Sequence, residues 1–460
     1  MEEMVRRKRL ATALLVTVLS ASLAACGGEP AAKPSPSPTT TKAPAKVKLV
    51  FGVSGHKTLV DTYKQLAAEY TQDVPNVTVE VKSWPTADQL TAAIDSGEKV
   101  DVVLTPRADV VKFAEDKSIQ PVDTLLEARN VDFGDKYSRE AMEDFSVDRR
   151  LECMPYSVSP QVVYVNTGLI DFEAMKKEGL PTPSVRADGS LRGWTLEQFG
   201  SAMTYAAEHN KGVRGTYVEQ NLSALMPWLA GAGATLFDDP LAPTTTALGD
   251  SAGAYEELVG ALNQPNVLAT SKDLGGRTPF QAFKQGRLVA LVGDRSLVSD
   301  LRATEGMEWD VMPMPGGNGT TGDYAGLCMG AETVDPDAAA DFLSYLISTE
   351  SVVKMVRTGH FVPVNSEVGY APVFTQPERN PKNARIFTDT VRDMQVLPEA
   401  TQLAQLQKVA APAVRGALAA AETDQIEDFA AQIDELSKTV FPQPTPAASP
   451  SPSTSPAPSS

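Results

Sequence analysis

Between positions 47 and 116, segments with the apolar pattern of a β-strand alternate with segments with the apolar pattern of an α-helix. Short runs rich in Val, Leu and Phe predict strands, and the segments between them carry apolar residues at helical spacing. The expected strands are 47–53, 76–81 and 100–104, and the expected helices are 58–70, 86–96 and 108–116. This order predicts a parallel sheet in an α/β unit, in which ligands bind at the carboxyl ends of the strands.

The same two patterns continue beyond residue 150 without a repeat of fixed period. Residues 151–165 are apolar and β-rich, and Thr195 with Gln198 forms a capping box at the start of a helix. Gly231 and Gly233 are expected to end the helix that begins at Asn221. Further strands are expected at 288–292 and 309–313, and further helices at 280–285, 337–348, 351–357 and 401–440.

The amino-terminal pattern is typical of a targeting segment. Arg6-Arg7-Lys8-Arg9 precedes an uncharged apolar run from Leu10 to Ala25, which is short for a membrane span. The run ends in Leu23-Ala24-Ala25-Cys26-Gly27, which looks like a bacterial lipobox. We therefore predict a lipoprotein signal peptide over 1–26, with lipid on Cys26 as the membrane anchor; an ordinary signal peptide that ends near a cysteine is the alternative.

Two tails flank the expected folded part. Residues 27–46 are rich in Pro, Thr, Ala and Lys, and residues 442–460 are rich in Pro, Ser, Thr and Ala. Such segments bury too little apolar surface to offset their conformational entropy, so we expect an extended tether and a disordered carboxyl-terminal tail. A spacer, a cell-wall contact and a glycosylated stretch all fit the tail.

Length and charge narrow the class of protein. Residues 47–441 exceed the usual size of a single hydrophobic core, so two lobes are expected. The formal net charge of −17 disfavours nucleic-acid binding. Neither the 3 histidines nor the cysteines beyond Cys26 have metal-site spacing, and no serine lies in a Gly-x-Ser-x-Gly elbow. No cofactor, metal or catalytic activity is expected.

The order of several motifs resembles a known family. These motifs are Met154–Asn166, Trp194–Phe199, Pro227-Trp228 with Gly231 and Gly233, Leu236–Asp239, Gly286–Asp294, Trp309–Pro315, Asp337–Leu346, Gly359–Pro363 and Asn380–Phe387. Each fragment alone is weakly specific, but together they span nearly all of 47–441. The chain is similar to the type-one extracellular solute-binding proteins, which include the maltose-binding and other oligosaccharide-binding proteins.

The resemblance implies the α/β two-lobe periplasmic-binding-protein type II fold, with hinge strands and an interlobe cleft. The first lobe would span roughly 47–153 and 329–375, and the second 157–325 and 376–441. A solute would stabilise the closed form, which an ABC permease would recognise. Cys153 and Cys328 would lie on neighbouring hinge strands, where they form either a disulfide or two buried thiols.

The resemblance and the strand ends together suggest the ligand-binding residues. The candidates are Ser54, His56, Arg107, Tyr156, Trp228, Asp294, Arg295, Ser296 and Tyr324. For the aromatic residues the alternative is a packing role in the core, and His56 is equally consistent with a surface position. Oligosaccharide binders often carry an aromatic residue near 405–407, where this chain has Gln405-Leu406-Gln407. A mono- or disaccharide, or another polar solute, is therefore favoured over a long glucan.

The expected function is capture of a solute, with carbohydrate favoured, by a monomeric receptor on the extracellular face of the membrane. Its expected partners are the solute and the subunits of an ABC permease. The alternative is a lipoprotein of the same fold that acts as a sensor accessory or a cell-envelope interaction protein. A glycoside hydrolase is disfavoured, because no recognisable motif pairs two carboxylates.

Overall fold

The structure is a computed structural model that describes residues 45–443, except 135, 185, 187–190, 240–241, 399 and 420–422. Cys26, the tether up to residue 44 and the tail from residue 444 lie outside the described residues, so the predictions for them stay predictions. Within the described part of the chain, no helix combines the length and the apolar character needed to cross a membrane.

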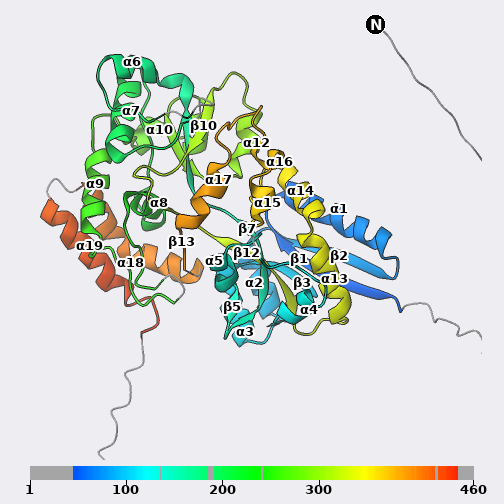
Figure 1. The fold of residues 1–460 in the computed structure, drawn as a ribbon. Coiled ribbons are helices and arrows are strands. Elements are labelled where there is room, and N and C mark those ends of the chain that lie inside the picture. Colours follow the sequence, from blue (N-terminus) through cyan, green and yellow to red (C-terminus); the bar gives the residue numbers. More distant parts are fainter. Residues whose placement is uncertain are drawn as a thin grey trace, which may run out of the picture. The chain divides into compact units, whose positions relative to one another are not determined.

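A mixed sheet of six strands forms one half of the fold (Figure 1). Its strands are β1 (Val47–Ser54), β2 (Val77–Trp84), β3 (Val102–Pro106), β4 (Ile119–Gln120), β7 (Cys153–Val158) and β12 (Tyr324–Gly330). β1 pairs in parallel with β2 and β3, which confirms the predicted parallel arrangement. β12 returns from far along the sequence and pairs antiparallel with β3, β4 and β7, so the complete sheet is mixed.

Helices pack on this sheet through their apolar faces. On α1 (Lys57–Asp73) the buried residues include Val60, Tyr63 and Leu66, and the Tyr63 ring lies 5.4 Å from that of Phe51 on β1. Phe342 on α13 meets the same Phe51 ring at 5.5 Å. The other helices near this sheet are α2 (Ala87–Asp95), α3 (Val110–Glu115), α4 (Asp123–Glu127), α5 (Arg139–Asp144), α13 (Pro336–Ile347), α14 (Thr349–Arg357), α15 (Ser366–Gly369) and α16 (Pro372–Thr375).

A second, antiparallel sheet lies within the other half of the fold. It has the order β10-β8-β9, from β8 (Val162–Asn166), β9 (Ala290–Gly293) and β10 (Trp309–Met312). The helices of this half are α6 (Phe172–Lys177), α7 (Leu196–His209), α8 (Leu222–Ala232), α9 (Ala252–Leu262), α10 (Ser271–Leu274), α11 (Pro279–Lys284), α12 (Leu297–Arg302) and α17 (Ile386–Asp389). The predicted capping box of Thr195 and Gln198 is present at the start of α7.

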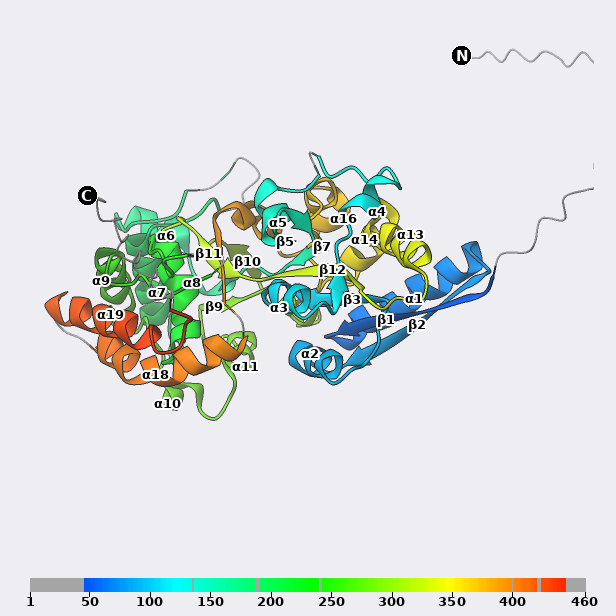
Figure 2. The same cartoon turned by 90° about the horizontal axis from the view of Figure 1, so that it is seen from below.

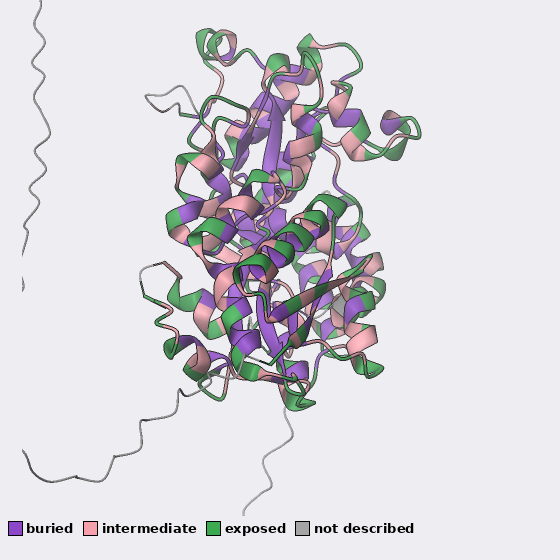
Figure 3. Ribbon diagram, turned by 90° about the vertical axis from the view of Figure 1, so that its right-hand side faces the viewer, coloured by how far each residue is buried: buried purple, intermediate pink, exposed green. Residues whose placement is uncertain are grey.

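The carboxyl-terminal helices α18 (Ala400–Ala419) and α19 (Thr423–Ser437) pack against α8 and α9 (Figures 1 and 2). Asp434 fixes α19, because its carboxylate accepts hydrogen bonds from the Thr246 hydroxyl at 2.6 Å and from the backbone N–H groups of Leu248 and Gly249. The buried residues fall into two hydrophobic clusters. One surrounds the six-stranded sheet and reaches α11 and α12, and the other joins α7, α8, α9, α18 and α19. Figure 3 shows the buried strands enclosed by helices with exposed outer faces.

The predicted end of helix α8 within Gly231-Ala232-Gly233 is confirmed. The helix ends at Ala232, and Gly233, where φ is 102°, is its C-cap. A Cβ on Gly231 would lie 2.6 Å from the Cβ of Met314, so this glycine permits close packing of α8 on the neighbouring chain. Gly233 alone supplies the left-handed conformation that ends the helix.

Two chain passages, 159–161 and 313–323, run between the larger and the smaller sheet. Strand β11 (Thr320–Gly322) lies in the second passage and pairs in parallel with β13 (Met394–Val396). The limits of the two lobes stay a prediction.

The disulfide between Cys153 and Cys328 joins β7 to β12 directly opposite each other, with Cα atoms 4.2 Å apart. Both residues are fully buried, and they lie at the end of the β7–β12 ladder away from the 159–161 passage. The bond therefore clips the core of the six-stranded sheet rather than the passage between the two sheets.

Candidate functional site

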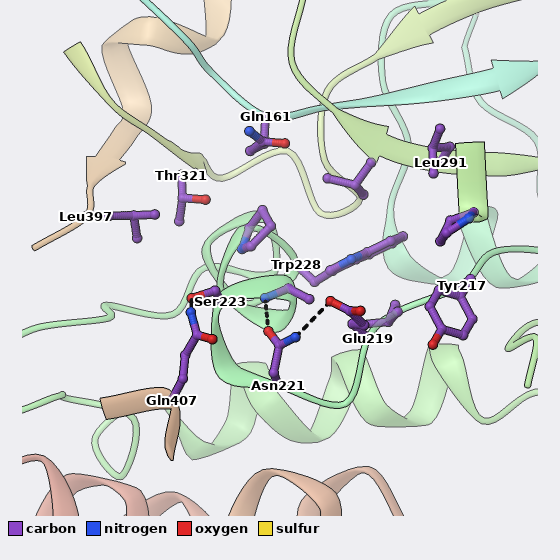
Figure 4. A pocket seen from close by; sticks show the side chains of 15 residues that line it. Gln161, Tyr217, Glu219, Asn221, Ser223, Trp228, Leu291, Thr321, Leu397 and Gln407 are labelled. Atoms are coloured by element: carbon purple, nitrogen blue, oxygen red, sulfur yellow. Dashed lines mark hydrogen bonds between the residues drawn. The ribbon is translucent and has the colours of Figure 1, made fainter. Parts of the chain in front are cut away.

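A pocket of about 570 Å³ opens beside α8 (Figure 4). Side chains from the 217–221 loop, α8, β9, β11 and α18 line it, so it gathers positions that are far apart in the sequence. Its polar and aromatic lining residues are Gln161, Tyr217, Glu219, Asn221, Ser223, Trp228, Thr321 and Gln407. Among the described residues, the lining includes one carboxylate and no lysine or arginine.

The start of α8 orients the polar side of this pocket. Asn221 is the N-cap, and its Oδ1 accepts from the backbone N–H of Ala224 at 2.8 Å. The amide of the same side chain donates to Glu219 Oε2 at 2.9 Å, so one residue both caps the helix and holds the carboxylate (Figure 4). Two turns of helix later, Trp228 forms a wall of the pocket while its ring packs edge-to-face on Phe199, 5.3 Å away.

Gln407 reaches the pocket from α18 and donates to the hydroxyl of Ser223 on α8. In the sequence, this region stands out only by the absence of an aromatic residue at 405–407. In the structure a carboxamide occupies the pocket wall there, which gives this side hydrogen-bonding capacity instead of a stacking surface. Glu219, Asn221, Gln161 and Thr321 were not predicted as site residues, because no local pattern marks them.

A smaller pocket of about 170 Å³ lies at the carboxyl ends of β1 and β3, where the parallel-sheet rule expects a ligand. Ser54, Thr105, Ser157, Ser159 and His360 contribute polar groups to it. His360 lies in the loop after α14 and was not predicted.

The two histidines His56 and His360 stack with ring centroids 4.3 Å apart. His360 Nδ1 also lies 3.1 Å from the carbonyl oxygen of Ser296, in the loop after β9. Burial, followed by the neighbouring His56, lowers the pKa of His360. The predicted residues His56 and Ser296 therefore meet at the edge of the smaller pocket, although neither lines it.

The other predicted residues are distributed more widely. Trp228 lines the larger pocket and Ser54 the smaller one. Asp294 uses its polar groups for hydrogen bonds within the protein. Its carboxylate accepts from the Ser296 backbone N–H at 2.8 Å, and its carbonyl oxygen accepts from the Tyr164 hydroxyl. Tyr324 lines a third pocket, of about 440 Å³, between α5 and β13.

Three predicted residues are buried and line none of these three pockets. Tyr156 is 3% exposed and packs against Phe361 at 5.0 Å, as its packing alternative requires. Arg107 is 6% exposed, and its charge acts on Asp144 and Asp323. Arg295 is 1% exposed. That these three residues bind ligand stays a prediction, and their burial does not favour it.

The carboxyl group of Asp323, directly before β12, is expected to make the stability of the protein depend on pH. Burial raises the pKa of its carboxyl to about 7 from 3.8, against the opposing charge of Arg107. Because the pKa in the folded state is the higher one, stability that is complete below pH 3.8 is lost as the pH rises towards 7. Asp323→Asn should therefore raise Tm at pH 8 and change it little at pH 4, whereas the exposed Asp250→Asn should show no such difference. An equal Tm change at both pH values would contradict the assignment.

Known proteins resemble this chain in sequence and in structure. Residues 65–382 match the family model described as bacterial extracellular solute-binding protein. The sugar-binding protein MalE from Xanthomonas citri is similar in structure, with a TM-score of 0.67, 14% identity and coverage of 85% of this chain and 98% of that one. The cyclic alpha-maltosyl-1,6-maltose binding protein from Arthrobacter globiformis has a TM-score of 0.66, 17% identity and coverage of 86% and 100%.

A third similar structure is the GacH receptor of Streptomyces glaucescens, solved unliganded and in complex with acarbose, with a TM-score of 0.65, 18% identity and coverage of 86% and 99%. The search of curated proteins finds no match. The structural likenesses confirm the predicted fold class, and the family model covers more than half of the sequence. The chain therefore belongs to the bacterial extracellular solute-binding protein family.

Proposed function

We propose that this protein captures a neutral carbohydrate outside the cell and delivers it to an ABC importer, while a lipid on Cys26 anchors it to the membrane. The family consists of receptors rather than enzymes, which confirms the expectation that the chain is not catalytic. The carbohydrate nature of the solute, its delivery to a permease and the lipid anchor are the parts of this proposal that go beyond membership of the family.

The proposal that the solute is a neutral carbohydrate rests on the chemistry of the larger pocket. Sugars present C–H faces that pack on aromatic rings, and hydroxyl groups that need fixed polar partners. Tyr217 supplies a partly exposed ring, Trp228 borders the pocket although it is 1% exposed, and the carboxamides and hydroxyls of the lining supply such partners. Glu219 can accept hydrogen bonds from sugar hydroxyls. Since the described residues that line the pocket include no lysine or arginine, a phosphorylated or acidic solute would lack a countercharge from them.

The size of the solute is also part of the proposal. The volume of about 570 Å³ falls within the usual range for small-molecule pockets. Gln407 lies in the region where oligosaccharide binders often carry an aromatic ring, so a further stacking surface is missing from this wall. These features favour a mono- or disaccharide over a long stacked glucan. Similarity to the sugar-binding protein from Xanthomonas citri and to the receptor solved with acarbose supports the carbohydrate class.

Capture would proceed by closure of two lobes whose limits are those expected from the sequence. The larger pocket would supply the contacts of the second lobe, and the smaller pocket at Ser54 and His360 those of the first. A solute that touches both would stabilise the closed form, and the permease would recognise that form.

Glu219→Gln tests the role of the pocket. Loss of a charge-assisted hydrogen bond is expected to weaken sugar binding roughly 10- to 100-fold. Calorimetric titration with sugars selected by thermal shift from a panel of sugars, polyols, sugar acids and amino acids would measure this. The matched control is Glu208→Gln, an exposed carboxylate on α7.

Two outcomes would overturn the proposal. Thermal-shift responses to amino acids or sugar acids alone would exclude a neutral carbohydrate. Equal sugar affinities for the Glu219→Gln and Glu208→Gln variants would exclude this pocket as the site. Sugar binding without sugar uptake in the intact cell would favour the alternative of a non-transport lipoprotein.

A further inference from the structure

Arg295 lies just before the short helix α12 and Arg302 is its last residue. Arg295 is 1% exposed, and its guanidinium lies over the ring of Phe374 on α16, 4.0 Å from the centroid. The ring of Phe387 lies 5.2 Å away. Arg295 donates a hydrogen bond from Nη2 to the carbonyl oxygen of Phe374 at 3.1 Å. Aromatic rings contact the face of a guanidinium and leave the N–H groups on its edge unused.

Part of the hydrogen-bonding capacity of these two arginines is not satisfied by the described residues. Arg295 Nε and Nη1 and Arg302 Nη2 are buried without a hydrogen-bond partner in the described part of the chain. Arg302 uses its other nitrogens, donating from Nε to the carbonyl oxygen of Asn380 at 2.7 Å and from Nη1 to the Gln376 side chain at 2.9 Å. The ion pairs formed by the described residues include neither arginine.

The charges that act directly on the two arginines are positive, although the carboxylate of Asp294, one residue before Arg295, acts on the same Tyr164 as they do. Burial, with a smaller contribution from the charge of Arg302, lowers the pKa of Arg295 to about 9, so Arg295 still carries its proton at neutral pH. Arg379 acts on Arg302 in the same direction. The phenol of Tyr164 faces both arginines, but it is neutral and donates its proton to the carbonyl oxygen of Asp294.

A water molecule could accept hydrogen bonds from the free N–H groups, but it would not neutralise the charge. Burial of an unpaired charge costs far more than burial of an unpaired neutral donor. We therefore propose that a small monovalent anion, of which chloride is the simplest, binds between Arg295 and Arg302. The three unpartnered nitrogens, two of them on an Arg295 that packs against aromatic rings, suit a compact ion of single charge better than a phosphate with its many acceptor oxygens.

The anion would stabilise the contact between α12 and the 374–380 segment. Arg295 and Arg302 already hold this segment through the backbone of Phe374 and Asn380 and the side chain of Gln376. An ion that screens the two positive charges would allow both arginines to remain in place. This site is separate from the two pockets of the proposed sugar site, whose lining residues do not include either arginine.

Thermal unfolding of the complete protein in sodium chloride tests the proposal. The salt is varied from 0 to 200 mM at constant ionic strength, with sodium isethionate, whose bulky anion should not fit, as the balancing salt. A saturable increase in Tm of about 2–4 °C is expected, because an anion that binds only the folded state stabilises it by mass action. Arg295→Met should abolish this increase, and the matched control Arg385→Met, at an exposed arginine paired with Asp389, should retain it.

A second measurement does not depend on the variant folding. Crystals of the unmodified protein soaked in sodium bromide should show an anomalous peak between the guanidinium groups of Arg295 and Arg302. A water molecule at this place with no anomalous signal would overturn the proposal. So would a chloride effect on Tm that is linear without saturation, or one that is equal in the Arg295→Met and Arg385→Met variants.

Discussion

Replacement of both Cys153 and Cys328 by serine is expected to lower the free energy of unfolding by about 2–5 kcal/mol. The disulfide closes a loop with a sequence separation of 175 residues, which includes the whole of the smaller sheet. A crosslink over such a long loop removes much conformational freedom from the unfolded chain. Guanidinium-induced unfolding would show the loss as a lower midpoint concentration.

The reduced protein provides the control for this double variant. Dithiothreitol should lower the unfolding midpoint of the unmodified protein towards that of the variant, and it should leave the variant unchanged. Binding of the solute should persist in both, because the two cysteines lie in the core of the six-stranded sheet and line neither pocket of the proposed site. An unfolding midpoint that responds neither to reduction nor to the substitution would contradict this role.

Trp228→Ala is expected to have the other large effect, a loss of about 3–5 kcal/mol of stability together with most of the affinity for solute. Trp228 is 1% exposed and belongs to the cluster of α7, α8 and α9, so its removal leaves a cavity in that core. The same side chain forms a wall of the larger pocket, where a sugar face would pack. Chemical unfolding and calorimetric titration would measure the two losses separately.

Trp194 allows the packing role of Trp228 to be separated from its binding role. Both indoles contact the ring of Phe199, at 5.1 Å for Trp194 and 5.3 Å for Trp228, but Trp194 does not line the larger pocket. Trp194→Phe and Trp228→Phe should therefore reduce stability by similar amounts, whereas affinity should fall only for Trp228→Phe. An equal loss of affinity in both variants would show that the binding effect is only a consequence of destabilisation.

Local patterns predicted much of the fold. The strands and helices between residues 47 and 116 lie within a few residues of their expected positions, and the capping box at Thr195 is present. These predictions succeed because hydrophobic period and capping chemistry depend on residues close together in the sequence. The family resemblance also rested on local motifs, and the family match confirms it.

Strand-end position was a weaker guide to the site. Of the residues that it suggested, Ser54 lines a pocket, whereas Arg107 and Arg295 follow strands in the same way and are buried. Whether a side chain after a strand points into a pocket or into the core depends on what packs against it. For Arg295 those neighbours are Phe374 and Phe387, which lie about eighty and ninety residues further along the chain.

The sequence by itself determined the family, the α/β class, most helix and strand positions and the presence of an aromatic candidate at Trp228. Only the tertiary structure decided that Gln161, Glu219, Thr321 and Gln407 share one pocket with it, and that Cys153 lies directly opposite Cys328. The physical reason is that periodicity and capping act over a few residues, whereas a pocket is formed by segments whose proximity results from packing of the whole chain.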